Sequence, residues 1–200
     1  MTDDEIELLL AVARTPEAPR ASLEERIQLL EDHRRLHDLV LTYGWLCDGR
    51  RWDELLDLYT DDFERFLVGT LEEHLVGKEV LRERYEAPVL PRKVVDGKGG
   101  DGGPPPAAQL NTYEIRHLIH PPLTRVSDDG TEATVAAVYS IVATTGGGSG
   151  SNGGAGDEFR RGEHEGGYIF GFRKVPDVGW RFCRMVVISE NARNPLFQSS

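Results

Sequence analysis

The sequence is short of positive charge, of cysteine and of long apolar runs, and each shortage excludes a class of protein. It carries 23 basic against 34 acidic side chains, a net charge of −11. We therefore expect no nucleic-acid partner, because phosphate binding needs a positive field. No run approaches the roughly 18 apolar residues that span a bilayer, so we expect no membrane partner.

The compartment follows from the same shortages. Cys47 and Cys183 are the two cysteines, too few for a disulfide framework. The N-terminal stretch MTDDEIELLLAVAR is acidic where a signal peptide would be basic. These features predict a soluble cytoplasmic protein.

A chain of 200 residues favours one domain with additions. We predict an N-terminal arm over residues 1–22, a domain over 23–190 and a C-terminal tail over 191–200. Residues 96–106 and 146–156 are rich in glycine and poor in apolar side chains, which predicts two flexible loops within the domain.

The first half of the chain has helical periodicity. Ser22-Leu23-Glu24-Glu25 is a capping box, which predicts a long helix from there to about residue 46. A second helix is predicted from about residue 52 to near 60, and a third over 78–85. Apolar residues at three- and four-residue steps in the first helix are expected core positions: Leu23, Ile27, Leu30, Leu36, Leu39, Val40, Tyr43 and Leu46.

The second half alternates like β-structure. A short strand is predicted over 63–68, and longer ones over 113–120, 132–145, 167–175 and 180–189. Helices followed by long strands predict an α+β fold, with three N-terminal helices packed against one face of a curved antiparallel sheet. The resulting cone-shaped barrel has one open end, a natural cavity for a small molecule.

Asp48 and His117 are the main candidates for chemistry. Asp48 follows an apolar helical face and precedes Gly49, so it is either a turn residue or a functional carboxylate. His117 shares a strand face with Tyr113, Ile115 and Ile119, which indicates either a core histidine or a base. A carboxylate that orients an imidazole would make a general base near neutral pH. Sequence spacing does not give the distance between the two.

Other groups are expected around the same cavity. Tyr43 precedes Asp48 by five residues, so both could lie at the cavity mouth. Trp45, Tyr139 and Arg184 are further candidates for substrate contacts, as is Tyr113 from its shared strand face. For the aromatic residues the alternative is packing in the core. For Arg184 the alternative is a hydrogen-bonded polar side chain on a strand.

Metal and cofactor motifs are lacking. His117 and His120 are three apart on a predicted strand, so they point to opposite faces and cannot chelate one ion. Residues 148–153 formally match a dinucleotide glycine fingerprint, but no apolar helical pattern follows them. No serine or cysteine lies in a nucleophile-elbow sequence. We therefore expect neither a metal nor a cofactor.

The order of the short motifs resembles a known superfamily. These motifs are Y-x4-D-x3-W from Tyr43 to Trp52, then L-Y-T-D-D-F, G-K-E-x-L, R-H-L-I-H and G-W-R-F. Together they resemble the nuclear transport factor 2-like superfamily, and within it the SnoaL-like branch that includes scytalone dehydratase and bile-acid dehydratase relatives. The resemblance covers roughly residues 23 to 190.

The resemblance implies a function. In dehydratase-type members an aspartate after the first long helix and a histidine on a later strand form a catalytic dyad, and Asp48 and His117 match them. Tyr43 matches the tyrosine that often precedes the aspartate. This implies a cofactor-independent lyase or isomerase, of dehydratase or cyclase type, acting on a small hydrophobic oxygenated metabolite as a homodimer or trimer. The alternative is a non-catalytic subunit, like the β subunit of ring-hydroxylating dioxygenases, or a ligand-binding module.

Overall fold

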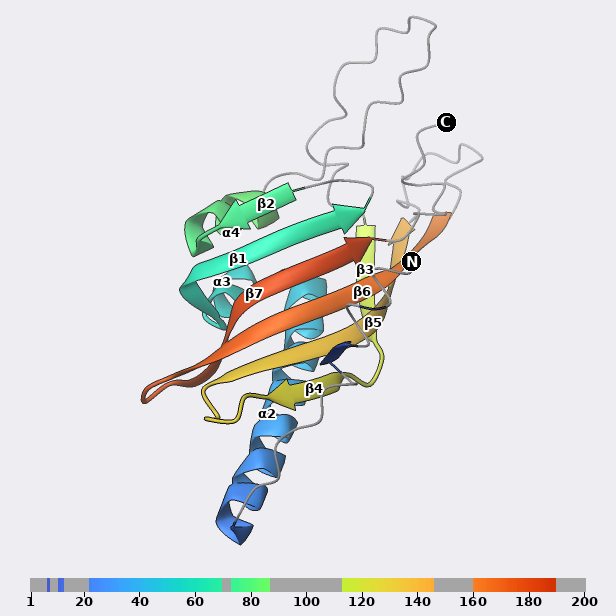
Figure 1. Cartoon of the computed structure of the whole chain (residues 1–200). Helices are drawn as coiled ribbons and strands as arrows, with labels where there is room; N and C mark the ends of the chain where they lie inside the picture. The colour runs from blue at the N-terminus through green and yellow to red at the C-terminus, as the bar shows by residue number, and fades with distance from the viewer. Residues whose placement is uncertain are drawn as a thin grey trace, which may run out of the picture.

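The computed structural model describes residues 22–69, 73–86, 113–145 and 160–189, together with Glu7, Ala11 and Val12. The predicted glycine-rich loops, the C-terminal tail and most of the N-terminal arm lie outside these residues. The fold is α+β, as predicted: a curved sheet lies in front of the long first helix in Figure 1. No helix in the described ranges is long and apolar enough to cross a membrane.

Within residues 22–86 of the described chain, three helices precede or interrupt the first strands. They are α2 (Leu23–Asp48), α3 (Trp52–Leu56) and α4 (Lys78–Glu86). The predicted capping box is present at the start of α2, where Glu25 N–H donates to Ser22 Oγ and Ser22 N–H donates to Glu25 Oε2.

The described residues form seven strands of one sheet. They are β1 (Tyr59–Gly69), β2 (Glu73–Val76), β3 (Tyr113–Ile119), β4 (Leu123–Val126), β5 (Glu132–Thr145), β6 (Arg160–Val175) and β7 (Gly179–Ser189). Their order is β2-β1-β7-β6-β5-β3, with β4 also paired to β5. All pairs are antiparallel except β1 with β7, which is parallel. A turn with Gly130 at φ +71° joins β4 to β5.

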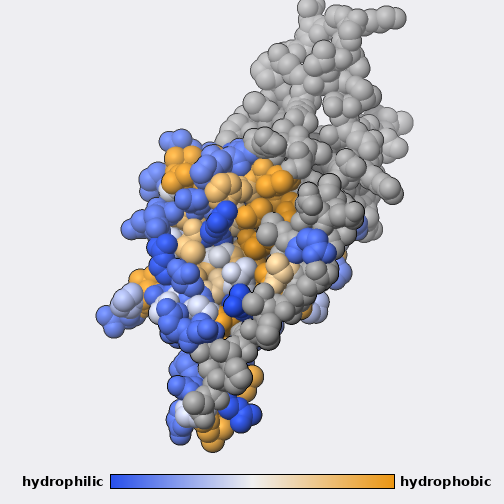
Figure 2. Space-filling model, viewed as in Figure 1, coloured by the Kyte–Doolittle hydropathy of each residue, from blue (hydrophilic) through white to orange (hydrophobic). Residues whose placement is uncertain are grey.

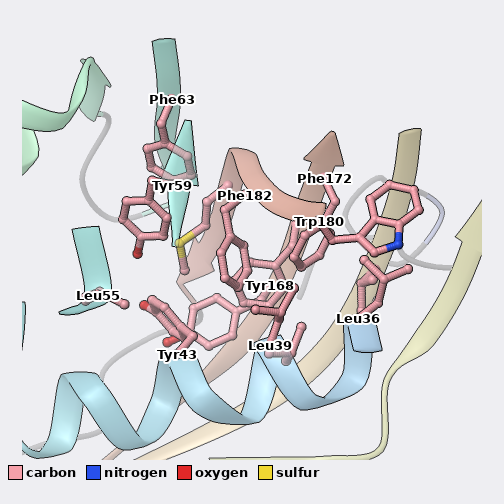
Figure 3. Packing of buried hydrophobic residues seen from close by; sticks show 14 of the residues in the cluster. Leu36, Leu39, Tyr43, Leu55, Tyr59, Phe63, Tyr168, Phe172, Trp180 and Phe182 are labelled. Carbon is pink, nitrogen blue, oxygen red and sulfur yellow. The ribbon is translucent and has the colours of Figure 1, made fainter. Parts of the chain in front are cut away.

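The core lies between α2 and the concave face of the sheet. Figure 3 shows Tyr43 and Leu39 of α2 directed at Tyr168 and Phe182 of the sheet. The Tyr43 ring meets Tyr168 and Phe170 edge-on, with centroids 5.7 and 5.5 Å apart. Aromatic side chains therefore occupy much of the interior that the sequence predicts as a cone.

A buried polar contact fixes α2 on the β6–β7 hairpin. Asp32, only 6% exposed, accepts hydrogen bonds from Trp180 Nε1 at 2.8 Å and from Lys174 Nζ at 3.0 Å. Gln28 Nε2 donates to the same carboxylate at 3.2 Å. These bonds satisfy the carboxylate at the point where α2 crosses the hairpin.

Some sequence predictions of the fold are wrong. Leu23, Ile27 and Leu30 are 63%, 48% and 69% exposed, because the N-terminal half of α2 extends beyond the sheet (Figure 1). The second helix ends at Leu56, and the chain is already extended in β1 from Tyr59. The short strand β2 and the parallel β1–β7 pair have no counterpart in the prediction.

Candidate active site

Asp48 and His117 are in direct contact, although 69 residues separate them in the chain. The His117 Nδ1 atom lies 2.6 Å from Asp48 Oδ1. The backbone N–H of His117 also donates to the same carboxylate, at 3.0 Å to Oδ1 and 3.1 Å to Oδ2. The His117 side chain is 10% exposed and the Asp48 side chain is 14% exposed, so the pair lies at the edge of the core.

The local structure explains this contact. Asp48 is the last residue of α2, and His117 lies in β3, which ends the strand order and pairs with β5 on one side. The carboxylate therefore takes up a backbone N–H that an edge strand would otherwise leave unpaired. Gly44 lets α2 approach: a Cβ there would lie 3.3 Å from His117 Cβ and 3.2 Å from Ile119 Cδ1.

This geometry fixes the imidazole chemistry. An ionised Asp48 can only accept hydrogen bonds, so in neutral His117 the ring proton is on Nδ1. Nε2 is then the basic nitrogen, and it has no hydrogen-bond partner among the described residues. An imidazole held in this way is able to act as an oriented general base.

Tyr43 lies beside the pair but inside the core. Its ring meets the His117 ring edge-on, with centroids 6.0 Å apart, and its side chain is 4% exposed. Burial raises the pKa of Tyr43 well above its usual value. Its hydroxyl therefore stays protonated at neutral pH and can act as a hydrogen-bond donor.

Tyr139 is buried in the core, where it stacks on Tyr168 with ring centroids 4.0 Å apart. Its hydroxyl donates to the Ile188 carbonyl at 3.5 Å. Tyr113 begins β3 opposite Thr145, and its side chain lies outside the described residues. Tyr139 thus has a packing role in the structure, and the contact predicted for Tyr113 stays a prediction.

The structure does not bring Trp45 or Arg184 to the dyad. Trp45 is 79% exposed, because two residues of helix turn it about 200° from Tyr43. Arg184 lies on the outer face of the sheet, with its guanidinium carbon 4.7 Å from the Phe66 ring centroid. A register shift in the β6–β7 pairing lets Phe182 and Met185, three residues apart, both face the core. Arg184 is turned outward as a result, against the predicted alternation.

Sequence reasoning missed two charged residues on the concave side, Arg65 in β1 and Glu73 in β2. The Arg65 side chain is 16% exposed and lies on the same strand face as the core residue Phe63. An alternating pattern of Phe63, Arg65 and Leu67 was the available signal. It marks Arg65 as an inward-facing arginine.

The described residues contain no group of three or more His, Cys, Asp or Glu side chains that could hold a metal ion. An open hollow of about 770 Å³ lies between β1, α4 and the β6–β7 hairpin. It is lined by charged residues that include Asp62, Lys78 and Arg173. Neither Asp48 nor His117 lines it, so it is separate from the dyad.

The family model of the SnoaL-like domain matches residues 28–186, a span that contains both dyad residues. The chain belongs to the SnoaL-like domain family. Among curated proteins none matches this chain.

Solved structures show the same fold. An NTF2-like protein with a cystatin-like fold from Novosphingobium aromaticivorans has 22% identity and a TM-score of 0.58, covering 88% of this chain and 95% of that one. A candidate scytalone dehydratase from the same species has 18% identity and a TM-score of 0.56, covering 86% and 97%. The β subunit of the benzoate 1,2-dioxygenase of Burkholderia mallei has 13% identity and a TM-score of 0.52, covering 90% and 100%.

These similarities confirm the predicted superfamily and the α+β architecture of the SnoaL-like chain. The similar structures include both a dehydratase-like protein and a dioxygenase subunit. Fold similarity therefore does not distinguish between the two predicted functions. The choice depends on the residues of the site.

Proposed function

We propose that this SnoaL-like protein is a cofactor-independent lyase or isomerase of small hydrophobic oxygenated molecules, with Asp48 and His117 as its acid/base dyad. The observation that supports it is the triple hydrogen bond of Asp48 to the ring and backbone of His117. A turn or cap would need the backbone contact alone. The additional 2.6 Å contact to Nδ1 orients the imidazole for proton transfer.

The proposed reaction begins at a carbon next to a carbonyl group. His117 Nε2 takes a proton from this carbon, and the electron pair moves to the carbonyl oxygen to form an enolate. Asp48 stabilises the imidazolium that results. When the enolate collapses, a hydroxyl group on the next carbon leaves, takes the proton back from Nε2 and departs as water. Return of the proton to a different carbon would give an isomerase instead.

Replacing His117 by Gln should reduce turnover of a hydroxylated ketone by about 100-fold or more, the usual contribution of a general base. Asp48→Asn should give a smaller but still large loss, because the amide can present the wrong partner to Nδ1. The measurement is the appearance of the conjugated product by ultraviolet absorbance, over a panel of hydroxylated cyclic ketones.

His37→Gln is the matched control, since His37 is also part-buried and hydrogen-bonded, to Thr124 Oγ1 at 2.9 Å, but away from the dyad. Histidine NMR gives a readout without substrate: the ring signals of His117 should change in Asp48→Asn and stay unchanged in His37→Gln. Full activity of either dyad variant on a confirmed substrate, or unchanged His117 ring signals in Asp48→Asn, would show that the dyad assignment is wrong.

The second candidate function is a non-catalytic subunit. The fold similarity to the benzoate dioxygenase β subunit supports it at the level of architecture. Purification from native cells separates the two functions. A stoichiometric complex with an iron–sulfur protein would support the subunit, and a self-assembled oligomer that turns over substrate would support the enzyme.

A further inference from the structure

A second polar group lies on the concave side of the sheet, centred on Arg65. Arg65 is in β1 between the core residue Phe63 and Leu67, which also packs against the core. Its Nη1 lies 3.7 Å from Glu73 Oε2, and its guanidinium carbon lies 5.9 Å from the Tyr85 ring centroid. The arginine is therefore held between β2 and α4.

Phenol groups extend this cluster into the core. The hydroxyl of Tyr85 lies 3.4 Å from that of Tyr59, and the Tyr85 ring stacks on Trp52 with centroids 5.0 Å apart. Figure 3 shows the hydroxyl ends of Tyr59 and Tyr43 on the same side of the core, near Leu55. Burial raises the pKa of both tyrosines, so they remain neutral hydrogen-bonding groups.

The charges of the cluster do not cancel. Glu73 Oε1 accepts a hydrogen bond from Arg84 Nε at 3.1 Å, so two arginines share one carboxylate. The cluster carries a net charge of about +1, and Arg65 is its inner member. A negatively charged or strongly polarised oxygen would be favoured beside it.

Two atoms of the cluster make no hydrogen bond within the described part of the chain, although one of them, Glu73 Oε2, is the ion-pair partner of Arg65. Arg65 Nε and Glu73 Oε2 are buried and make no hydrogen bond with the described residues. Buried polar atoms without hydrogen-bond partners are costly and uncommon, so these two atoms are available to a water molecule or to a bound polar group. An oxygen atom of a bound molecule near Arg65 Nε would accept a hydrogen bond from its N–H group.

The Arg65 cluster and the dyad border the same part of the core. Tyr43 contacts the His117 ring edge-on and belongs to the same core cluster as Tyr59. The hydroxyl of Tyr59 lies 3.4 Å from that of Tyr85, the tyrosine whose ring lies beside the Arg65 guanidinium. The base and the cation therefore both border the core cluster that contains these tyrosines.

We propose that Arg65 is a substrate-binding residue that holds an oxyanion, the enolate or phenolate oxygen of the molecule on which the dyad acts. This inference rests on the proposed function and names its substrate class: ketones or phenols whose oxygen carries negative charge during the reaction. Arg65 takes the place that the sequence analysis gave to Arg184. Proton removal by His117 moves an electron pair to this oxygen, and the guanidinium compensates the charge.

The test is binding of 4-nitrophenol to the full chain, followed by the absorbance of its phenolate form. We expect the wild-type protein to bind the phenolate and to lower the apparent pKa of the bound phenol. Arg65→Met should weaken binding about ten-fold or more, the usual effect of losing a hydrogen bond to a charged group. Glu73→Gln should tighten it, since the variant removes the competing negative charge.

Arg116→Met is the matched control, because Arg116 is an exposed arginine of β3 whose guanidinium donates to the Ile115 carbonyl. It should bind the phenolate like the wild type. Equal binding by Arg65→Met and Arg116→Met, or no binding by the wild-type chain, would overturn the inference. His117→Gln should still bind nitrophenolate, so a failure of the dyad proposal and a failure of this one give different results.

Discussion

At the scale of single residues, Asp48 combines the two roles that the sequence left as alternatives. It ends α2, and its carboxylate accepts the backbone N–H of an edge strand, as a structural residue would. The same carboxylate contacts the His117 ring nitrogen at 2.6 Å. One side chain thus fixes the position of β3 and the tautomer of its histidine, so its loss should affect both.

The buried thiol of Cys47, next to Asp48, should make the free energy of unfolding depend on pH. Burial raises the pKa of its thiol to about 12, against a hydrogen bond with Tyr43 that lowers it. An unfolded cysteine titrates near pH ~8.5. Above that pH the unfolded chain releases a proton that the folded chain keeps, so the free energy of unfolding falls by up to about 1.4 kcal/mol per pH unit. Below about pH 8 the thiol is protonated in both the folded and the unfolded chain, so it causes no loss of stability there.

The measurement is urea unfolding of the wild type and of Cys47→Ala between about pH 8 and about pH 10. The wild type should lose stability more steeply with rising pH than the variant. The buried tyrosines act in the same direction but are common to both proteins, so they cancel in the comparison. Parallel pH profiles would contradict the prediction.

At the scale of elements, the site depends on how closely α2 packs on β3. Glycine within a helix costs about 1 kcal/mol relative to alanine, so Gly44, about one turn before the end of α2, needs a packing reason. The approach to His117 and Ile119 supplies it. The spacing between a helix and an edge strand therefore sets the Asp48–His117 distance.

Gly44→Val should push α2 away from β3. We expect a loss of about 1–3 kcal/mol in the free energy of unfolding, from overpacking at contacts that are already tight. We also expect a changed NMR signal for the His117 ring and reduced turnover. Leu41→Val is the control, since it also introduces a β-branched residue into α2 but at a position that is 45% exposed. Equal effects of the two variants would show that Gly44 is not needed for the close packing of α2 on β3.

Periodicity predicted elements and faces well. The limits of β5, the extent of α4 within one residue and the face that His117 shares with Ile115 and Ile119 follow from local patterns. What covers a face depends on distant segments, and periodicity does not contain that information. Leu23, Ile27 and Leu30 have a core pattern, yet no sheet lies opposite them.

The site shows the same division. A position for Asp48 at the end of a helix and one for His117 on an inward strand face were predictable. Their contact, across 69 residues, was not. Arg65 was missed because its environment comes from β2, a four-residue strand with no clear signal, and from Tyr85 of α4. Arg184 was misplaced because a register shift interrupts the alternation of β7.

At the scale of the whole molecule, the outer face of the sheet carries apolar side chains among polar ones. Figure 2 shows apolar residues gathered on the face that is turned to the viewer, over the sheet of Figure 1. Strand register aligns Ala136, Ile169, Val186 and Phe66 in one row across β5, β6, β7 and β1. Val138 and Val68 belong to the adjacent row and are 46% and 40% exposed.

Exposed apolar side chains on a sheet face are typical of an interaction surface. Val12 of the N-terminal segment packs against part of it, beside Ala136 and Ile188, and leaves Val138 and Val68 accessible. The predicted homo-oligomer would bury these two side chains between copies of the chain. We therefore propose that two copies associate through the outer face of the sheet, with the dyad on the opposite, concave side.

Val138→Glu and Val68→Glu should each weaken this association about ten-fold or more, since every copy would bring an unpaired carboxylate into an apolar contact. The measurement is sedimentation equilibrium of the wild type and the variants at several concentrations. Both positions are exposed in the single chain, so thermal unfolding of the variants at high dilution should change little. Val178→Glu, at a 52% exposed position in the β6–β7 turn, is the control and should assemble like the wild type. A monomeric wild type, or variants that assemble as strongly as the control, would show that this face does not join copies of the chain.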